Sequence, residues 1–264
     1  FARVFPADSM RVIFPVSQLA LAAYMFVVGL EFHLDIVSQR LRSAAAVSIA
    51  GMITPFVLGA TLGWFFFKHT TLFPEKTSFT AGTIFLGASM CITAFPVLAR
   101  ILQFKKLTGT AMGVISLGAG AINDAAAWIL LALVFASISG DYSEVVVNVG
   151  GGVAYVGVVM LVVRPLLARW GRGAELRGTL SDSEFTGCLV LLAVGAWFTD
   201  LIGLHGVFGA FIMGVAMPRG IVTTTLTQRI QPLTVALLLP LFFTYSGLNT
   251  QIGLLDSVYL LAMA

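Results

Sequence analysis

Long apolar runs alternate with short polar connections along this chain of 264 residues. Most of the runs approach or exceed 20 residues, the length that an α-helix needs to cross the hydrocarbon core of a bilayer. The pattern therefore predicts membrane-spanning helices. Eight segments are expected, over residues 12–30, 44–67, 79–99, 109–138, 145–167, 185–204, 206–218 and 231–248, and a ninth begins near residue 255.

Composition strengthens this interpretation. The chain is 58% hydrophobic and 10% charged, with a mean hydropathy of +0.98, whereas soluble domains carry about 25% charged residues. We therefore expect an all-α integral membrane protein. The net charge of +3 is too small to indicate a nucleic-acid partner. Cys91 and Cys188 lie in apolar runs without disulfide or metal spacing, so we expect buried thiols and no cofactor.

The distribution of Lys and Arg predicts an orientation. Eleven of these residues fall in the connections after the first, third, fifth and seventh segments, and four fall elsewhere. Positive residues collect on the cytoplasmic side, which places Phe1 on the extracytoplasmic side. The seventh segment is short, so segments six and seven could also form one re-entrant pair. Two separate spans are favoured because a single crossing would destroy the charge alternation.

The ends of the chain predict a longer polypeptide, and a similarity between two of its segments predicts an internal structural repeat. The chain begins at Phe1 and stops inside the apolar run "VYLLAMA", so residues 1–264 are expected to be one transmembrane domain within a longer polypeptide. Segment one ends "YMFVVGLEFHLDIV" and segment eight ends "LFFTYSGLNTQIGLL". By the charge pattern these segments run in opposite directions, which is typical of the inverted repeats of secondary transporters.

Asp124 is the main candidate for chemistry. It lies about fifteen residues from either end of segment four, and therefore near the bilayer midplane. A carboxylate costs roughly 2.5–3.5 kcal/mol at that depth. It could be structural, either paired with a buried cation or placed in a soluble core helix, but no Lys or Arg lies in the middle of any segment. Because desolvation disfavours the charged carboxylate, we expect a reversible site for a proton or a small cation.

Asn123 is adjacent, but neighbours on a helix point about 100° apart. Its amide needs hydrogen-bond partners at this depth. Two roles are open and compatible: it could hold a neighbouring broken helix, or it could join two intact helices.

The stretch Thr93–Pro96 predicts a break within segment three. Proline removes a helical hydrogen bond and disfavours helix at the residue before it. Ala94, Phe95 and Pro96 are therefore expected to form an unwound stretch whose carbonyls could hold an ion beside Thr93. An ordinary proline kink is the alternative. Glu31 is expected at the membrane interface, where segment one ends.

Taken together, "ITAFPVLARIL", "GAINDAAAWILLAL", "FVVGLEFHLD", "GLHGVFGAFIMGVAMPR" and "LPLFFTYSGLNT" resemble the monovalent cation/proton antiporters. The resemblance covers residues 12–256. It is strongest to the branch that contains fungal and plant K⁺/H⁺ exchangers, bacterial Na⁺/H⁺ exchangers and Kef-type systems.

The resemblance implies a homodimer of about thirteen-helix subunits with an inverted repeat, in which a core domain moves against a dimer domain. It also implies that Asp124 is the essential carboxylate, that Asn123 is its partner and that Thr93 lies in the unwound crossing helix. Many relatives carry Ser or Asp where this chain has Ala94, so that ligand is missing here. Two helices before Phe1 and most of three after segment eight are expected outside the sequence.

The expected function is therefore exchange of H⁺ for Na⁺ or K⁺ by alternating access at Asp124. A cation channel or a Kef-type K⁺ efflux system of the same fold is the alternative. A membrane-embedded hydrolase would need a second midspan carboxylate or a metal cluster, neither of which the sequence contains, so we do not expect an enzyme. A sensor or scaffold would leave Asp124 unexplained. One Asp, one Asn and one Thr do not define a cavity, so both cations remain candidates.

Overall fold

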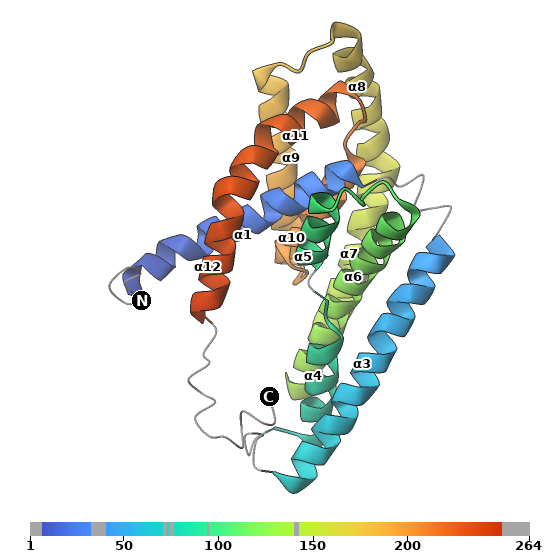
Figure 1. The fold of residues 1–264 in the computed structure, drawn as a ribbon, viewed down its shortest axis with the longest axis vertical. Helices are drawn as coiled ribbons and strands as arrows, with labels where there is room; N and C mark the ends of the chain where they lie inside the picture. Colours follow the sequence, from blue (N-terminus) through green and yellow to red (C-terminus); the bar gives the residue numbers. More distant parts are fainter. Residues whose placement is uncertain are drawn as a thin grey trace.

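The computed structural model describes residues 7–32, 41–70, 73, 77–93, 95–139 and 143–249. All the regular secondary structure in these ranges is helical (Figure 1). Two π-helical stretches, η1 (Val159–Val163) and η2 (Thr234–Leu238), join α7 to α8 and α11 to α12. The α-helices are α1 (Ala7–Glu31), α3 (Leu41–His69), α4 (Phe79–Cys91), α5 (Phe95–Phe104), α6 (Ala111–Ser139), α7 (Ser143–Val158), α8 (Arg164–Arg177), α9 (Asp182–Leu201), α10 (Gly206–Ala216), α11 (Ile221–Leu233) and α12 (Leu239–Asn249).

The all-α membrane fold predicted from the apolar runs is confirmed. Seven of the eight predicted segments each correspond to one helix, and the third is divided into α4 and α5. Five continuous helices within the described ranges are long and apolar enough to cross a membrane. They are Met10–Glu31, Arg42–His69, Val145–Arg177, Asp182–Leu201 and Ile221–Asn249.

Helix ends differ from the predicted segment ends by ten residues at two places. The fifth segment was expected to end near residue 167, but the helix continues to Arg177 and ends at Gly178, whose φ of 67° is left-handed. The eighth was expected to begin near residue 231, but the helix begins at Ile221. Hydropathy marks the part of a helix that lies in lipid, whereas a helix continues into water until a residue interrupts it.

The helices form two groups (Figure 1). Helix α1 crosses the middle of the molecule and contacts α9, α10, α11 and α12, whereas α3, α4, α5 and α6 pack with one another. The long helix from α7 to α8 connects the groups, because α7 contacts α6 and α8 contacts α11.

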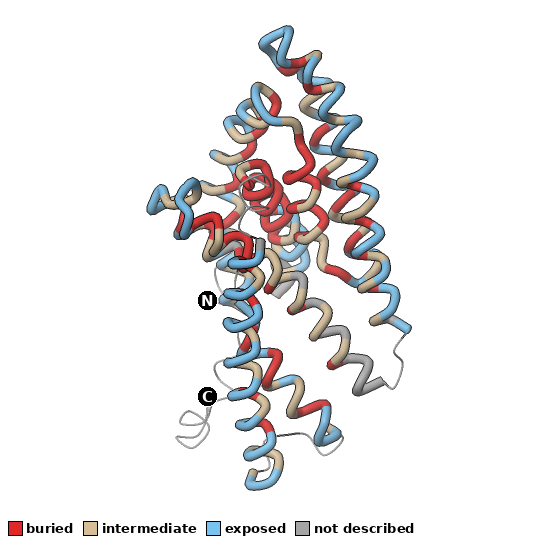
Figure 2. The backbone as a smooth tube through the Cα atoms, turned by 90° about the vertical axis from the view of Figure 1, so that its right-hand side faces the viewer, coloured by how far each residue is buried: buried red, intermediate tan, exposed pale blue. Residues whose placement is uncertain are grey.

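Helix α1 is the centre of the buried core. Residues 20–30 are all buried, and Figure 2 shows the buried positions gathered in the middle of the molecule. Its crossing with α10 requires glycine on both helices. A Cβ atom at Gly29 would lie 2.3 Å from the carbonyl oxygen of Phe211, and one at Gly214 would lie 2.2 Å from that of Phe26. Small residues let two helix backbones approach this closely within a membrane.

The predicted inverted repeat extends beyond the described residues. The first copy ends within residues 33–40 and the second ends after residue 249. The repeat therefore stays a prediction.

Candidate cation and proton site

The helix of segment three is interrupted before its proline. Helix α4 ends at Cys91, Ile92 is extended with φ −76° and ψ 123°, and Thr93 is not helical. Helix α5 then begins at Phe95, whose N–H donates to the carbonyl of Thr93 over 2.9 Å. The interruption thus separates a helix C-terminus from a helix N-terminus inside one predicted span.

Phe95 and Pro96 were expected to be unwound, but both lie in the first turn of α5. The first N–H groups of a helix have no partner within it, so a proline at this position removes no hydrogen bond. The interruption therefore begins at Ile92, one residue before the predicted break Thr93–Pro96, and includes Thr93. Ala94 lies outside the described residues.

The start of α5 packs against the middle of α6. A Cβ atom at Gly120 would lie 2.8 Å from the ring of Phe95 and 3.2 Å from Leu98. Phe95 also meets Phe211 of α10 edge to face, with ring centroids 5.4 Å apart. The first turn of α5 is therefore held between the two groups of helices.

Asp124 lies one turn along α6 from this contact. Residues four apart share a helix face and are separated by about 6 Å along the axis, so Gly120 and Asp124 present to the same side of α6. The Asp124 carboxylate is half-buried and makes neither a hydrogen bond nor an ion pair with any described residue. Its oxygen lone pairs are therefore available to a proton or a cation.

The ion pairs found in the described ranges lie away from Asp124. Arg177 pairs with Glu184 over 2.5 Å, and Arg229 pairs with Asp182 over 2.7 Å. They join α9 to α8 and to α11, and neither involves α6.

Asn123 faces a different neighbour. Its side chain is 8% exposed, and its Oδ1 accepts a hydrogen bond from the Oγ of Ser48 on α3. The observed contact therefore corresponds to the second role considered for Asn123, which joins two intact helices. Ser48 is not among the residues predicted for the site, although a hydroxyl inside the apolar run 44–67 is a signal for a helix–helix contact.

Thr93 is exposed within the described structure. Its carbonyl accepts from Phe95, but its hydroxyl makes no hydrogen bond with any described residue. The structure thus places Asp124 one turn along α6 from the contact with the first turn of α5, and Asn123 against α3, while Thr93 lies at the interruption itself.

A cavity of about 700 Å³, lined largely by polar residues, lies where α1 and α5 end and α11 begins. Glu31 accepts hydrogen bonds there from Gln103 Nε2 at 2.7 Å and from Gln231 Nε2 at 3.5 Å. Arg219 donates to the carbonyls of Leu30 and Phe32 at the C-terminal end of α1. Glu31 is thus part of a network that joins three helices, which its position at the end of an apolar run did not indicate.

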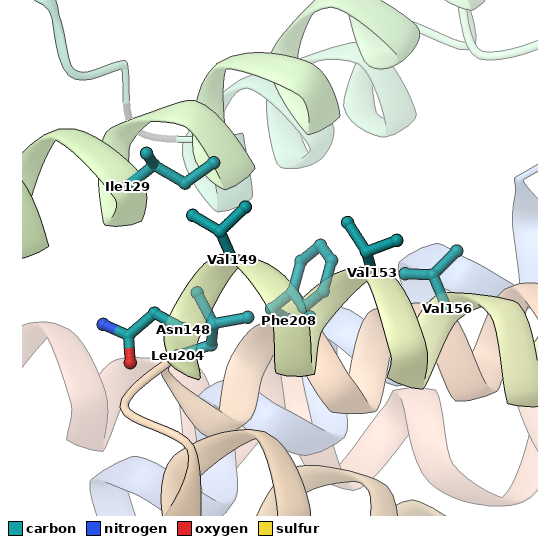
Figure 3. A pocket seen from close by; sticks show the side chains of 8 residues that line it. Ile129, Asn148, Val149, Val153, Val156, Leu204 and Phe208 are labelled. Atoms are coloured by element: carbon teal, nitrogen blue, oxygen red, sulfur yellow. The ribbon is translucent and has the colours of Figure 1, made fainter. Parts of the chain in front are cut away.

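A second cavity, of about 260 Å³, separates α6 from α7 (Figure 3). Ile129 of α6 faces Val149 and Val153 of α7 across it, and Phe208 of α10 contributes to its wall. The lining is almost wholly apolar, so this cavity cannot replace the hydration shell of an ion.

Comparison with known proteins agrees with this architecture. The family described as "Sodium/hydrogen exchanger, transmembrane" matches residues 7–264. Cation/H(+) antiporter 15 of Arabidopsis thaliana is 37% identical over 255 residues, which are 95% of this chain and 30% of that protein. Na(+)/H(+) antiporter NhaS4 of Synechocystis sp. is 35% identical over 265 residues, covering 98% of this chain and 63% of that protein.

A fungal relative is also similar over nearly the whole of this chain. K(+)/H(+) antiporter 1 of Saccharomyces cerevisiae is 32% identical over 262 residues, covering 96% of this chain and 29% of that protein. The chain thus spans between about a third and two thirds of the length of these relatives. Since the family match extends over nearly all of the sequence, the chain belongs to the sodium/hydrogen exchanger family.

Proposed function

We propose that the polypeptide containing this chain is a secondary antiporter that exchanges H⁺ for a monovalent cation, Na⁺ or K⁺, with Asp124 as the carrier. The observation that carries the proposal is a half-buried carboxylate in the middle of α6, one helical turn from the contact between Gly120 and the first turn of α5, with no charged partner among the described residues. The names of the relatives, which include Na⁺/H⁺, K⁺/H⁺ and cation/H⁺ antiporters, point to the same chemistry.

Exchange follows from competition at one carboxylate. A single carboxylate that holds either a proton or a cation, and is presented to each side in turn, links the two movements without a chemical reaction. In this proposal Thr93 and the carbonyls at the end of α4 supply oxygen ligands, because the last carbonyls of a helix have no partner within it. Asn123 then acts by holding α6 in place.

The proposed orientation keeps the Lys- and Arg-rich connections on the cytoplasmic side. Three contacts support it by joining these connections at one end of the helices. Glu31 binds Gln103, Arg219 binds the carbonyl of Phe32, and Arg229 pairs with Asp182. We further propose that the protein works as a homodimer, on the resemblance to its family.

Proton movement in proteoliposomes tests the function. Vesicles with an acidic interior and an external pH-sensitive dye receive NaCl or KCl, and wild type should release protons in response. Asp124→Asn keeps the shape of the side chain but cannot carry a proton, so exchange should be lost. Asp182→Asn is the matched control, because Asp182 is 92% exposed at the start of α9, and it should exchange normally.

Two results would refute the proposal. Near-normal exchange by well-folded Asp124→Asn would show that the carboxylate is structural. Cation flux through wild type that moves no protons would indicate a channel of the same fold instead.

A further inference from the structure

Several hydroxyl groups within the described helices bond to their own helix. A serine or threonine inside a membrane helix can donate to the carbonyl three or four residues earlier, which satisfies it without a partner helix. This is the arrangement of Ser17 with Phe14 (2.7 Å), Thr61 with Val57 (2.7 Å), Ser89 with Leu86 (2.9 Å), Thr199 with Gly195 (3.1 Å) and Thr234 with Ile230 (2.8 Å).

Ser48 departs from this arrangement. Its hydroxyl donates to Oδ1 of Asn123, which lies 75 positions later on α6. Ser48 is 1% exposed and Asn123 is 8% exposed, so water competes little for either group. A buried polar group that loses its partner keeps the full cost of its desolvation, so this contact resists separation.

The position of the contact relates it to Asp124. Asn123 and Asp124 are consecutive, so any rotation of α6 that breaks the bond to Ser48 turns Asp124 by the same angle. The face of α6 that carries both Gly120 and Asp124 would then turn away from the first turn of α5, which packs against Gly120. The bond between Ser48 and Asn123 therefore fixes the direction of the carboxylate, although Ser48 does not touch it.

We propose that Ser48 is a positioning residue for ion exchange, which sets the rotation of α6 and thereby the direction in which Asp124 meets the cation and the proton. This inference rests on the proposed function of Asp124. It predicts that removing the Ser48 hydroxyl changes the apparent affinity for the cation and the pH dependence of exchange, besides any effect on stability.

The test compares Ser48→Ala with Ser48→Thr in the complete polypeptide reconstituted in proteoliposomes. Exchange is measured against NaCl and KCl concentration over a pH series. Ser48→Ala should raise the apparent KM about three- to tenfold, the effect of losing one hydrogen bond, and should move the pH midpoint. Ser48→Thr keeps a donor and should restore both values toward wild type. Thr61→Val is the control, because it removes an exposed hydroxyl of α3 that bonds only to Val57.

A double variant separates positioning from general loosening. If Ser48 acts through Asn123, Ser48→Ala combined with Asn123→Ala should have the KM of Asn123→Ala alone. Should Ser48→Ala not fold, Ser48→Cys retains a weak donor of similar size and should give an intermediate KM.

The outcomes distinguish this inference from the proposed function. An unchanged KM and pH profile in folded Ser48→Ala, or a loss of thermal stability alone, would overturn the positioning role while Asp124→Asn stays inactive. If Asp124→Asn still exchanges in the same preparation, the proposed function fails, and this inference fails with it.

Discussion

Substituting Gly120 with alanine tests the geometry of the site directly. The new Cβ atom would lie 2.8 Å from the ring of Phe95, closer than such atoms can approach. Phe95 is 1% exposed and packs against Phe211 on its other side, so its ring cannot swing away into lipid. Either α5 or α6 must shift, and that shift separates the first turn of α5 from the turn that carries Asp124.

The expected change in the free energy of unfolding combines two opposing effects. Forcing one extra carbon into a packed contact costs about 1–3 kcal/mol, whereas alanine stabilises the interior of a helix by about 0.5–1 kcal/mol relative to glycine. Gly120→Ala should therefore destabilise the protein by up to roughly 2.5 kcal/mol. Gly150→Ala is the matched control in α7, since a Cβ atom there has nothing within 4 Å and only the stabilising effect applies.

Thermal unfolding in detergent and proton flux in proteoliposomes are the two assays. Gly120→Ala should unfold at a lower temperature than Gly150→Ala and should exchange more slowly than wild type, because its α5 is displaced from Asp124. Equal stability of the two variants would show that Phe95 does not pack against α6 at this point. Lower stability with an unchanged exchange rate would show that the packing exists but does not support the site.

Two contacts of α1 and the proposed orientation can be tested by further substitutions. Gly29→Ala should destabilise more than Gly120→Ala in the same thermal assay, at or above the upper end of about 1–3 kcal/mol, because its Cβ would meet the backbone carbonyl of Phe211 at 2.3 Å; a neutral effect would refute the close crossing of α1 and α10. Arg219→Gln should lower stability by about 1.5–3 kcal/mol, the worth of a charged hydrogen bond, since its guanidinium binds two carbonyls at the end of α1; a melting temperature equal to that of wild type would contradict this. Single cysteines at Arg172 and Arg229 should react with a membrane-impermeant maleimide from the same side of oriented vesicles, and labelling from opposite sides would refute the proposed orientation.

The sequence alone determined the class of fold and identified Asp124 as the main candidate for binding a proton or a cation. An apolar run of about 20 residues predicts a spanning helix whatever its neighbours are, because the backbone of a helix satisfies its own hydrogen bonds in lipid. Asp124 was recognised for a related reason, since the cost of a carboxylate depends on its depth within one segment. The interruption near Pro96 was also predictable, because proline acts on its own helix.

The tertiary structure decided which helix faces meet. The bond from Ser48 to Asn123, the Arg219 contact with the end of α1 and the Glu31 network each join residues more than seventy positions apart. Nor did the sequence indicate that α1 is the buried centre of the molecule, because it is apolar in the same way as helices that face lipid. Apolar side chains suit a protein core and a bilayer equally well, so hydropathy does not distinguish them. Only the close fit of particular helix surfaces, such as Gly29 against Phe211, selects one arrangement.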